Sequence, residues 1–239
     1  MRWDPRLLIA RPVKRRDFTY TTLKVALRPA LRAAANVRVA GLHHVPATGP
    51  AILAANHVSV LDSLYVPLVV PRRITYLAKA EYWDSWRTRW ILDAAGHIPV
   101  RRGRVASARD ALDNAGQLLR SGGLLGVYPE GTRSPDGRLH RGKTGVAVLA
   151  ARSGCPVVPI GIAGTAALVP KGTKLPRRRG HVVVRFGAPL WIEPRAGSHQ
   201  RRRFLDALMT EIAALSGQRY DRRTPDQDER PSPVSLAVS

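Results

Sequence analysis

A histidine and an aspartate five positions apart, His57 and Asp62, carry the strongest chemical signal of the 239-residue sequence. They follow an apolar run, residues 51–55, and precede a helical stretch. A strand-to-helix junction places polar side chains at the rim of an open α/β sheet, where ligands bind. From about one turn inside the helix, the Asp62 carboxylate can reach one imidazole nitrogen and leave the other free to take a proton. A histidine oriented in this way is a general base, which contributes typically ~10²–10⁴ to a reaction rate.

The same stretch has a purely structural interpretation. Ser59 and Asp62 also match a capping box, in which Ser59 is the N-cap of the helix and the Asp62 side chain accepts the backbone N–H of Ser59. In that alternative Asp62 does nothing for His57. The residues around the pair leave both interpretations open.

A second polar segment, Y-P-E-G-T-R-S at residues 128–134, follows the apolar run 124–128. Glu130 and Arg133 would emerge from the end of a strand into a turn that contains Gly131. The guanidinium of Arg133 is a planar fork suited to a phosphate. The alternative is an ordinary turn, which its proline and glycine alone would indicate. The polar residues around them favour a binding site.

Two further segments are weaker when each is taken alone. Residues 96–103, G-H-I-P-V-R-R-G, are a short apolar run that ends in Arg101 and Arg102, and by itself this pattern indicates a solvated basic turn. Residues 157–161, V-V-P-I-G, are typical of a buried strand whose role is packing.

Residues 137–144 match the P-loop pattern G-x-x-x-x-G-K-T. A P-loop follows a strand that ends at its first glycine, whereas here the nearest predicted strand ends at residue 128. No later predicted strand ends in an aspartate that would hold Mg²⁺. We therefore reject nucleotide hydrolysis, although the amine of Lys143 can still bind some other phosphate.

Apolar runs typical of buried strands alternate with helical stretches along the middle of the chain, which predicts an α/β domain with a mostly parallel central sheet flanked by helices. The predicted strands are residues 51–55, 74–78, 124–128, 157–162 and 182–186. The predicted helices between and after them are residues 61–70, 82–95, 105–119, 145–153 and 200–215. The predicted divisions are a basic N-terminal helical segment (1–38), a main domain (39–217) and a disordered polar tail (218–239).

The N-terminal segment carries ten Lys and Arg residues against two aspartates. Within it residues 18–35 have helical spacing of apolar positions, although Pro29 is unfavourable inside a helix. Two interpretations stand level. The helix packs on the domain with a solvated basic face, or it lies on anionic lipid, where each basic residue adds about 1 kcal/mol.

Three tryptophans, Trp83, Trp86 and Trp90, fall on one face of the predicted helix 82–95. Such a stripe most often belongs to the core, and this is the interpretation we favour. The alternative, suggested by the neighbouring arginines, is a membrane interface or the lining of an acyl-chain tunnel.

Basic residues outnumber acidic ones by 39 to 17, which gives a net charge of +22. This charge predicts an anionic partner: nucleic acid, an anionic membrane face or a phosphorylated substrate. The one cysteine, Cys155, excludes an internal disulfide framework and a thiolate zinc cluster, and the histidines lack metal-ligand spacing, so we expect no metal. We see no membrane span and no secretory signal, and we expect a protein that stays in the cytoplasm.

Four segments in this order resemble the 1-acylglycerol-3-phosphate (lysophosphatidic acid) and glycerol-3-phosphate acyltransferase family. They match its blocks N-H-x-x-x-x-D (residues 56–62), G-x-I-P-V-x-R (96–102), F-P-E-G-T-R-S (128–134, with Tyr for Phe) and V-P-I (158–160). The first and third blocks are specific, and the resemblance covers roughly residues 36–190. One departure is Arg101, where the family often has an acidic residue. On this resemblance, residues 39–217 would form the acyltransferase domain.

The resemblance implies an enzyme that moves a fatty acyl chain from acyl-CoA or acyl-carrier protein directly to a hydroxyl of lysophosphatidic acid, giving phosphatidic acid in phospholipid biosynthesis. His57 would take the hydroxyl proton and Asp62 would orient it, with Asn56 and Ser59 in support. The acceptor's glycerol phosphate would be bound by six residues: Arg102, Glu130, Gly131, Thr132, Arg133 and Lys143. No metal or bound cofactor is required. The protein would be peripheral, on the cytoplasmic face of the cell membrane.

Glycerol 3-phosphate or another lysolipid is an alternative acceptor for the same chemistry. The alternative from a different class is a basic nucleic-acid-binding protein, which the stretches 171–179 and 201–203 favour. Only 6% of residues are aromatic and no nucleic-acid-binding motif is recognisable, so we expect no nucleic acid partner. A membrane-surface scaffold with an inactive acyltransferase fold is a third alternative, which the intact His57 and Asp62 oppose.

Overall fold

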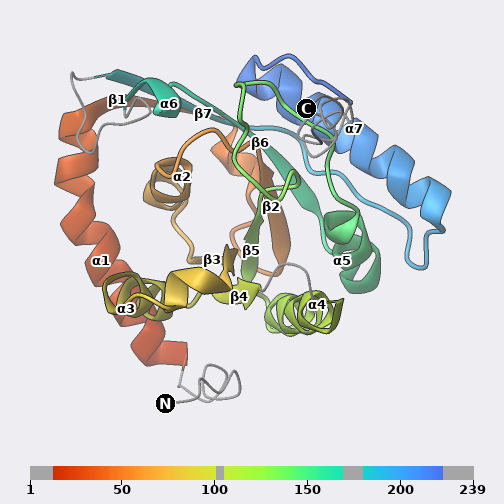
Figure 1. The fold of residues 1–239 in the computed structure, drawn as a ribbon, viewed down its shortest axis with the longest axis horizontal. Helices are drawn as coiled ribbons and strands as arrows, with labels where there is room; N and C mark the ends of the chain where they lie inside the picture. Colours follow the sequence, from red (N-terminus) through yellow and green to blue (C-terminus); the bar gives the residue numbers. More distant parts are fainter. Residues whose placement is uncertain (1–12, 101–104, 169–179, 223–239) are drawn as a thin grey trace, which may run out of the picture.

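The computed structural model describes residues 13–100, 105–168 and 180–222. Within them a seven-stranded sheet has the strand order β1-β7-β6-β2-β5-β3-β4, with helices on both faces (Figure 1). The strands are β1 (Ala35–Ala40), β2 (Ala51–Ala55), β3 (Ile74–Lys79), β4 (Ile98–Val100), β5 (Leu124–Val127), β6 (Val157–Ala163) and β7 (Gly180–Phe186). Neighbouring strands are parallel except for β6 and β7. The predicted α/β class with a mostly parallel sheet is confirmed.

Seven α-helices in the described residues cover this sheet. They are α1 (Val13–Ala34), α2 (Asp62–Val69), α3 (Trp86–Ala95), α4 (Val105–Arg120), α5 (Gly145–Ser153), α6 (Thr165–Leu168) and α7 (Ser198–Ser216). Side chains of α1, α2 and α6 join one hydrophobic cluster, and those of α4, α5 and α7 join the cluster on the opposite face. Alternate residues of β2 feed the two clusters, because successive side chains of a strand point to opposite faces.

The central strand β2 is buried along its whole length, between β5 and β6. All three run in the same direction, so their carboxyl ends meet at one edge of the sheet. The segments that leave this edge are the loop before α2, the loop after β5 and the short helix α6. This edge therefore collects the polar residues that follow each strand.

All five predicted strands are present, but two edge strands were missed. β1 has only its first residue buried, and β4 is three residues long, so neither has the apolar run of a central strand. The predicted helix 82–95 is divided, because a 3-10 turn (Ala80–Trp83) precedes α3.

The predicted N-terminal helix is present and begins earlier, at Val13, with Pro29 inside it. It leads directly into β1, so the predicted division after residue 38 falls inside a strand of the sheet. A separate role for residues 1–38 stays a prediction. Among the residues that the structure describes, no helix has the length and hydropathy that a membrane crossing requires.

The tail expected to be disordered from Gln218 is ordered at its start. Leu139 forms a parallel bridge with Tyr220, in which the Leu139 N–H donates to the Arg219 carbonyl (3.0 Å) and the Asp221 N–H donates to the Leu139 carbonyl (2.7 Å). Residues 218–222 therefore pair with the loop after β5, and this part of the prediction is wrong. Residues 223–239 lie outside the described residues.

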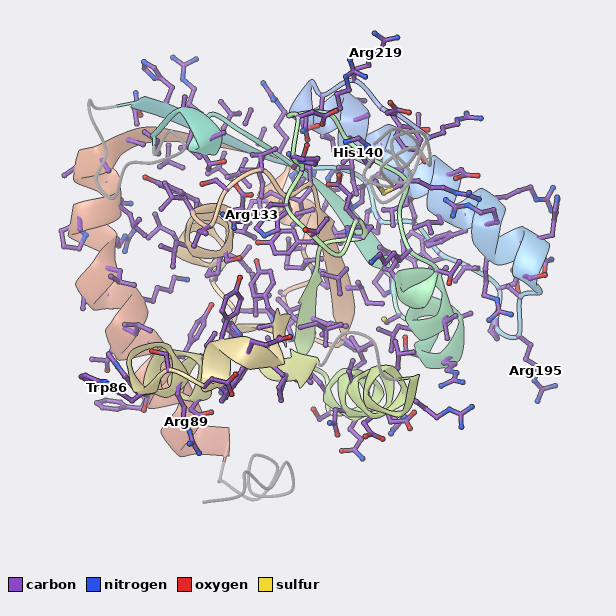
Figure 2. All side chains as sticks on the ribbon, viewed as in Figure 1. Trp86, Arg89, Arg133, His140, Arg195 and Arg219 are labelled. Carbon is purple, nitrogen blue, oxygen red and sulfur yellow. The ribbon has the colours of Figure 1, made fainter. Side chains whose placement is uncertain are left out.

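The tryptophan stripe divides into a buried and an exposed part. Trp83 is buried and its indole N–H donates to the Asp93 carboxylate at 2.8 Å, which confirms the core interpretation for this residue. Trp86 is 74% exposed and Trp90 is 54% exposed, so the core interpretation is wrong for both. In Figure 2, Trp86 and Arg89 project outward from α3.

Candidate active site

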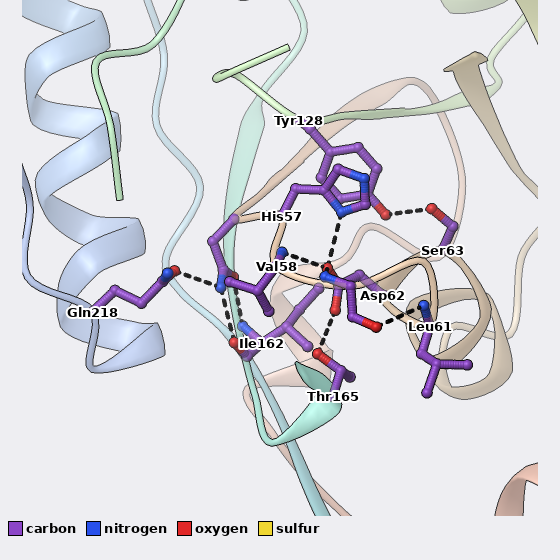
Figure 3. Close-up of polar contacts among 11 residues, drawn as sticks. His57, Val58, Leu61, Asp62, Ser63, Tyr128, Ile162, Thr165 and Gln218 are labelled. Atoms are coloured by element: carbon purple, nitrogen blue, oxygen red, sulfur yellow. Dashed lines mark hydrogen bonds and ion pairs between the residues drawn. The ribbon is translucent and has the colours of Figure 1, made fainter. Parts of the chain in front are cut away.

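The turn between β2 and α2 brings the His57 imidazole onto the Asp62 carboxylate (Figure 3). Nδ1 of His57 lies 2.9 Å from Oδ2 of Asp62. A ring nitrogen that faces a carboxylate donates its proton to it, which leaves Nε2 with a lone pair in the neutral ring. The His57 side chain is 15% exposed, and none of the described residues hydrogen-bonds to Nε2. The pair therefore has the geometry of an oriented general base.

The Asp62 carboxylate is completely buried, and a buried charge requires donors on both oxygens. Besides His57, Oδ2 accepts the backbone N–H groups of Val58 and Ser59, each at 2.8 Å. Oδ1 accepts the hydroxyl of Thr165 at 2.6 Å. Four donors therefore fix this carboxylate, and one of them comes from the segment after β6.

The two interpretations of Asp62 are both realised in part. Its carboxylate accepts the Ser59 backbone N–H, which is one half of a capping box. The other half is missing, because the Ser59 hydroxyl instead accepts the Leu61 N–H at 3.3 Å. Leu61 is the N-cap of α2, and its own side chain makes no capping bond. The Asp62 carboxylate thus holds the turn and contacts the imidazole, so the two roles are not exclusive.

Two aromatic rings, Tyr128 and then Tyr76, stack against one face of the His57 imidazole. The Tyr128 ring lies parallel to that of His57, with centroids 3.8 Å apart, and its hydroxyl hydrogen-bonds to Ser63 at 2.7 Å. Tyr76 stacks behind Tyr128 with centroids 5.6 Å apart. Only glycine fits at Gly126, because an added Cβ would collide with the Tyr76 ring. Burial raises the pKa of both tyrosines, which keeps them as neutral phenols beside the histidine.

The second predicted segment, residues 128–134, lies against the first. The Ser134 backbone N–H donates to the His57 carbonyl at 2.7 Å. Gly131 has a positive φ of 73°, which favours glycine at the turn, and Thr132 is half-buried beside it. The structure therefore brings together the two specific sequence blocks, which are far apart in the chain.

Glu130, predicted to bind substrate, is 3% exposed. Its Oε2 accepts the His140 backbone N–H at 2.9 Å, and its Oε1 is buried without a hydrogen-bond partner among the described residues. Burial raises the pKa of Glu130 to about 7, although the His140 N–H partly opposes this. Glu130 therefore holds the loop that contains His140, and its carboxyl does not face solvent.

Two predicted cations flank this loop at the same edge. Arg133 is exposed, and Lys143 is exposed with its backbone N–H bonded to the Pro129 carbonyl at 2.8 Å. The Lys143 side chain runs along Gly131, where an added Cβ would lie 3.2 Å from Nζ. Arg102, with Arg101, lies outside the described residues. In the described part of the chain, no three metal-ligating side chains gather in one place.

Asn56 connects the two strands that carry this edge. It is completely buried, its Oδ1 accepts the Ile162 N–H at 2.7 Å and its Nδ2 donates to the Ile162 carbonyl at 2.9 Å. Nδ2 also donates to the Gln218 side chain at 2.7 Å (Figure 3). Asn56 thus binds β6 as a backbone neighbour would, at the position that directly precedes His57.

Sequence reasoning missed three participants: Thr165, Tyr128 as a stacking partner, and the pair formed by His140 and Asp136. Thr165 lies just after the end of β6, and the rule that drew attention to His57 could have found it. The His140 imidazole is 2.8 Å from Asp136 through Nε2 and anchors the loop on Glu130. Its partner lies four residues away in a turn, a spacing with no distinctive sequence signal.

The chain matches the family model described as Acyltransferase over residues 36–163. It is 32% identical over 155 residues to the chloroplastic 1-acyl-sn-glycerol-3-phosphate acyltransferase LPAT1 of Arabidopsis thaliana, which covers 64% of this chain and 43% of that protein. It is 34% identical over 125 residues to the alpha 1-acyl-sn-glycerol-3-phosphate acyltransferase of Mus musculus, covering 52% of this chain and 44% of that protein. The matches span less than half the length of these two relatives.

A solved structure has the same fold. The crystal structure of PlsC, the 1-acyl-sn-glycerophosphate (LPA) acyltransferase of Thermotoga maritima, matches with a TM-score of 0.67 and 25% sequence identity. The match covers 87% of this chain and 85% of the other. The likeness therefore extends beyond residues 36–163.

The raised pKa of Glu130 predicts a pH-dependent stability. Unfolded glutamate loses its proton near 4.5, whereas folded Glu130 keeps its proton up to about 7, so stability falls as pH rises between these values. Glu130→Gln removes this loss. We expect the difference in unfolding free energy, variant minus wild type, to grow by about 2 kcal/mol from pH 5 to pH 8. Urea denaturation at the two pH values measures it, and parallel pH profiles for the two proteins would contradict the prediction.

Proposed function

We propose that this chain, which belongs to the acyltransferase family, transfers a fatty acyl group from a thioester to the free hydroxyl of lysophosphatidic acid, giving phosphatidic acid. The observation that carries the proposal is the His57–Asp62 pair, with Nε2 of the imidazole left open at the edge of the sheet. The names of the Arabidopsis, mouse and Thermotoga relatives support this acceptor.

In the proposed mechanism, Nε2 of His57 takes the proton of the acceptor hydroxyl while the oxygen attacks the thioester carbonyl carbon. The carbon–sulfur bond breaks, and the imidazolium returns its proton to the departing thiolate. Asp62 holds the ring in the required tautomer and stabilises the imidazolium. The acyl group passes directly between the two substrates, and these residues require no metal or bound cofactor.

The acceptor phosphate would bind to the exposed ends of Arg133 and Lys143 and to the turn formed by Gly131 and Thr132. A guanidinium and an ammonium at one edge suit the charge and geometry of a phosphate monoester. Arg102 remains part of the proposal on the strength of its block. Glu130, because it is buried, would position the loop rather than touch the acceptor. Glycerol 3-phosphate and other lysolipids carry the same phosphate and remain alternative acceptors, as acyl-CoA and acyl-carrier protein are alternative donors.

We also propose that the protein works as a peripheral protein on the cytoplasmic face of the cell membrane. α1 is basic, it contacts α3, and both helices expose large apolar side chains: Phe18, Val25, Trp86 and Trp90. Aromatic and basic side chains together are typical of a membrane interface, and the acceptor is itself a lipid.

The first test of the reaction is thiol release from palmitoyl-CoA by the full chain, measured with lysophosphatidic acid, with glycerol 3-phosphate and without acceptor. His57→Ala should lower acceptor-dependent release by at least ~10²-fold, because the general base is lost. His199→Ala, an exposed histidine on α7, should leave the rate unchanged. Release that is equally fast in the His57→Ala protein would overturn the mechanism.

The result of the thiol-release assay also distinguishes an acyltransferase from a nucleic-acid-binding protein. If the first assay shows no release, it is repeated with acyl-carrier protein in place of acyl-CoA as the acyl donor. A nucleic-acid-binding protein would show no acceptor-dependent release with either donor, and its binding would fall steeply with salt and ignore His57→Ala.

Asp62→Asn tests whether the carboxylate orients the imidazole. Asparagine would turn an N–H toward some of the four donors, so we expect kcat to fall by at least ~10²-fold with a smaller change in KM. Asp110→Asn is the matched control, because it makes the same chemical change at an exposed residue of α4. If Asp62→Asn lowers the unfolding free energy but leaves kcat of the folded protein intact, the helix-capping role alone is correct.

For membrane binding, the double variant Trp86→Ser with Trp90→Ser should lower co-sedimentation with vesicles of phosphatidylcholine and phosphatidylglycerol several-fold. The reason is the loss of two large apolar side chains at the interface. Trp191→Ser is the control, since Trp191 is 63% exposed and lies outside α1 and α3. Equal losses in the double variant and the control would place the contact elsewhere.

A further inference from the structure

A cavity of about 400 Å³ that is open to solvent lies where α1, β1 and α2 meet, and four of its lining residues are exposed: Arg28, Arg32, Asn36 and Val39. Leu68 and Val69 line it from the last turn of α2, while Asp62 is the first residue of the same helix. At a rise of 1.5 Å per residue, the cavity is about 10 Å along the helix axis from Asp62. The cavity is therefore separate from the proposed reaction centre and uses none of its residues.

One wall of the cavity is strongly basic. Arg28 and Arg32 line it from α1, and Lys24 lies one turn before Arg28 on the same face. The Lys24 amine donates to the Val70 carbonyl. Burial, and then the charge of Arg28, lower the pKa of Lys24, so these cations act on one another.

No acid in the described part of the chain compensates these charges. Among the side chains that the structure describes, no carboxylate lies within ion-pair distance of Arg28 or Arg32, and the single acid in the sequence of α1, Asp17, comes about three turns before Arg28. Like charges four residues apart destabilise a helix. Arg32 lies in the last turn and complements the helix dipole there, but Arg28 does not. An anion between the two guanidiniums would offset this repulsion.

The rest of the lining consists of apolar side chains apart from the amide of Asn36. Val37 and Val39 of β1 face the cavity together with Leu68 and Val69. The volume falls in the range of pockets that bind whole organic molecules, about 300–1,000 Å³, and is more than a lone phosphate occupies. Two guanidinium forks suit a phosphate, and the branched aliphatic side chains suit a hydrocarbon. The combination fits an amphiphile with an anionic head.

We propose that this cavity binds an anionic phospholipid, with its phosphate between Arg28 and Arg32 and the start of its acyl chain along Val37, Val39 and Leu68. It would be a second lipid site, distinct from the centre that transfers the acyl group, and it does not depend on that activity. Its place beside α1 would couple the membrane-facing helix to the lipid composition of the surface on which the protein lies.

The test is isothermal titration of the full chain with short-chain phosphatidic acid below its micelle concentration. Every protein in the series carries Arg133→Gln, which weakens binding at the proposed reaction centre equally in all arms. Arg28→Gln with Arg32→Gln should lower the affinity by at least about tenfold, because two charge-assisted contacts are lost. The matched control removes two exposed arginines, Arg195→Gln with Arg203→Gln, and Arg195 lies at the opposite end of the molecule from α1 (Figure 2). An equal effect of the two double variants would overturn the proposal.

Two further arms test the head group and the apolar wall. Inorganic phosphate should bind at least about tenfold more weakly than the lipid, because it cannot use the apolar wall. Val39→Ser should weaken lipid binding and leave phosphate binding unchanged. Equal affinity for lipid and phosphate would show a simple phosphate site and overturn the assignment to a lipid. Thermal unfolding of each variant checks that the fold is intact, which the exposure of all four arginines leads us to expect.

Discussion

The burial of the Asp62 carboxylate is the constraint on which the geometry of the His57 turn depends. Asp62 has no exposed surface, so its charge can persist only where protein donors replace water. Two of those donors are backbone N–H groups of the turn itself, which fixes the path of the chain from β2 into α2. Because the hydroxyl of Thr165 is another, the turn is also fixed to the end of β6. The His57 imidazole is the fourth donor, so the carboxylate that fixes the turn also fixes the orientation of the ring.

The second specific segment completes this constraint from β5. Tyr128 covers the imidazole face, and the bond from Ser134 to the His57 carbonyl holds the backbone on the same side. A phenylalanine, which the family pattern has at this position, would supply the same stacking surface without the bond to Ser63. The tyrosine hydroxyl therefore adds a link from the end of β5 to α2, whereas the contact with His57 is made by the ring.

Much of the fold and of the candidate site could be predicted because the sequence patterns that indicate them are local. The five predicted strands are continuous apolar runs, and His57 and Asp62 are close enough in the chain to be recognised as a pair. The edge strands β1 and β4 escaped prediction because neither has the long apolar run on which recognition depends. Periodicity wrongly places Trp86 and Trp90 in the core, because it predicts that a face is apolar but not what covers it. Thr165 is 103 residues from Asp62 in the chain, and only the order of strands in the sheet makes them neighbours.

The excess of 22 positive charges has a different status from these fixed contacts. A diffuse positive field attracts any polyanion and raises encounter rates, but it selects nothing by itself. Selection requires cations held at defined places beside groups that recognise the rest of the ligand. The Lys143 side chain lies along the turn at Gly131, and Arg28 and Arg32 line a cavity beside Val37, Val39 and Leu68. Asp62 begins α2, and Leu68 and Val69 lie in its last turn, so one short helix separates the proposed reaction centre from the proposed lipid cavity.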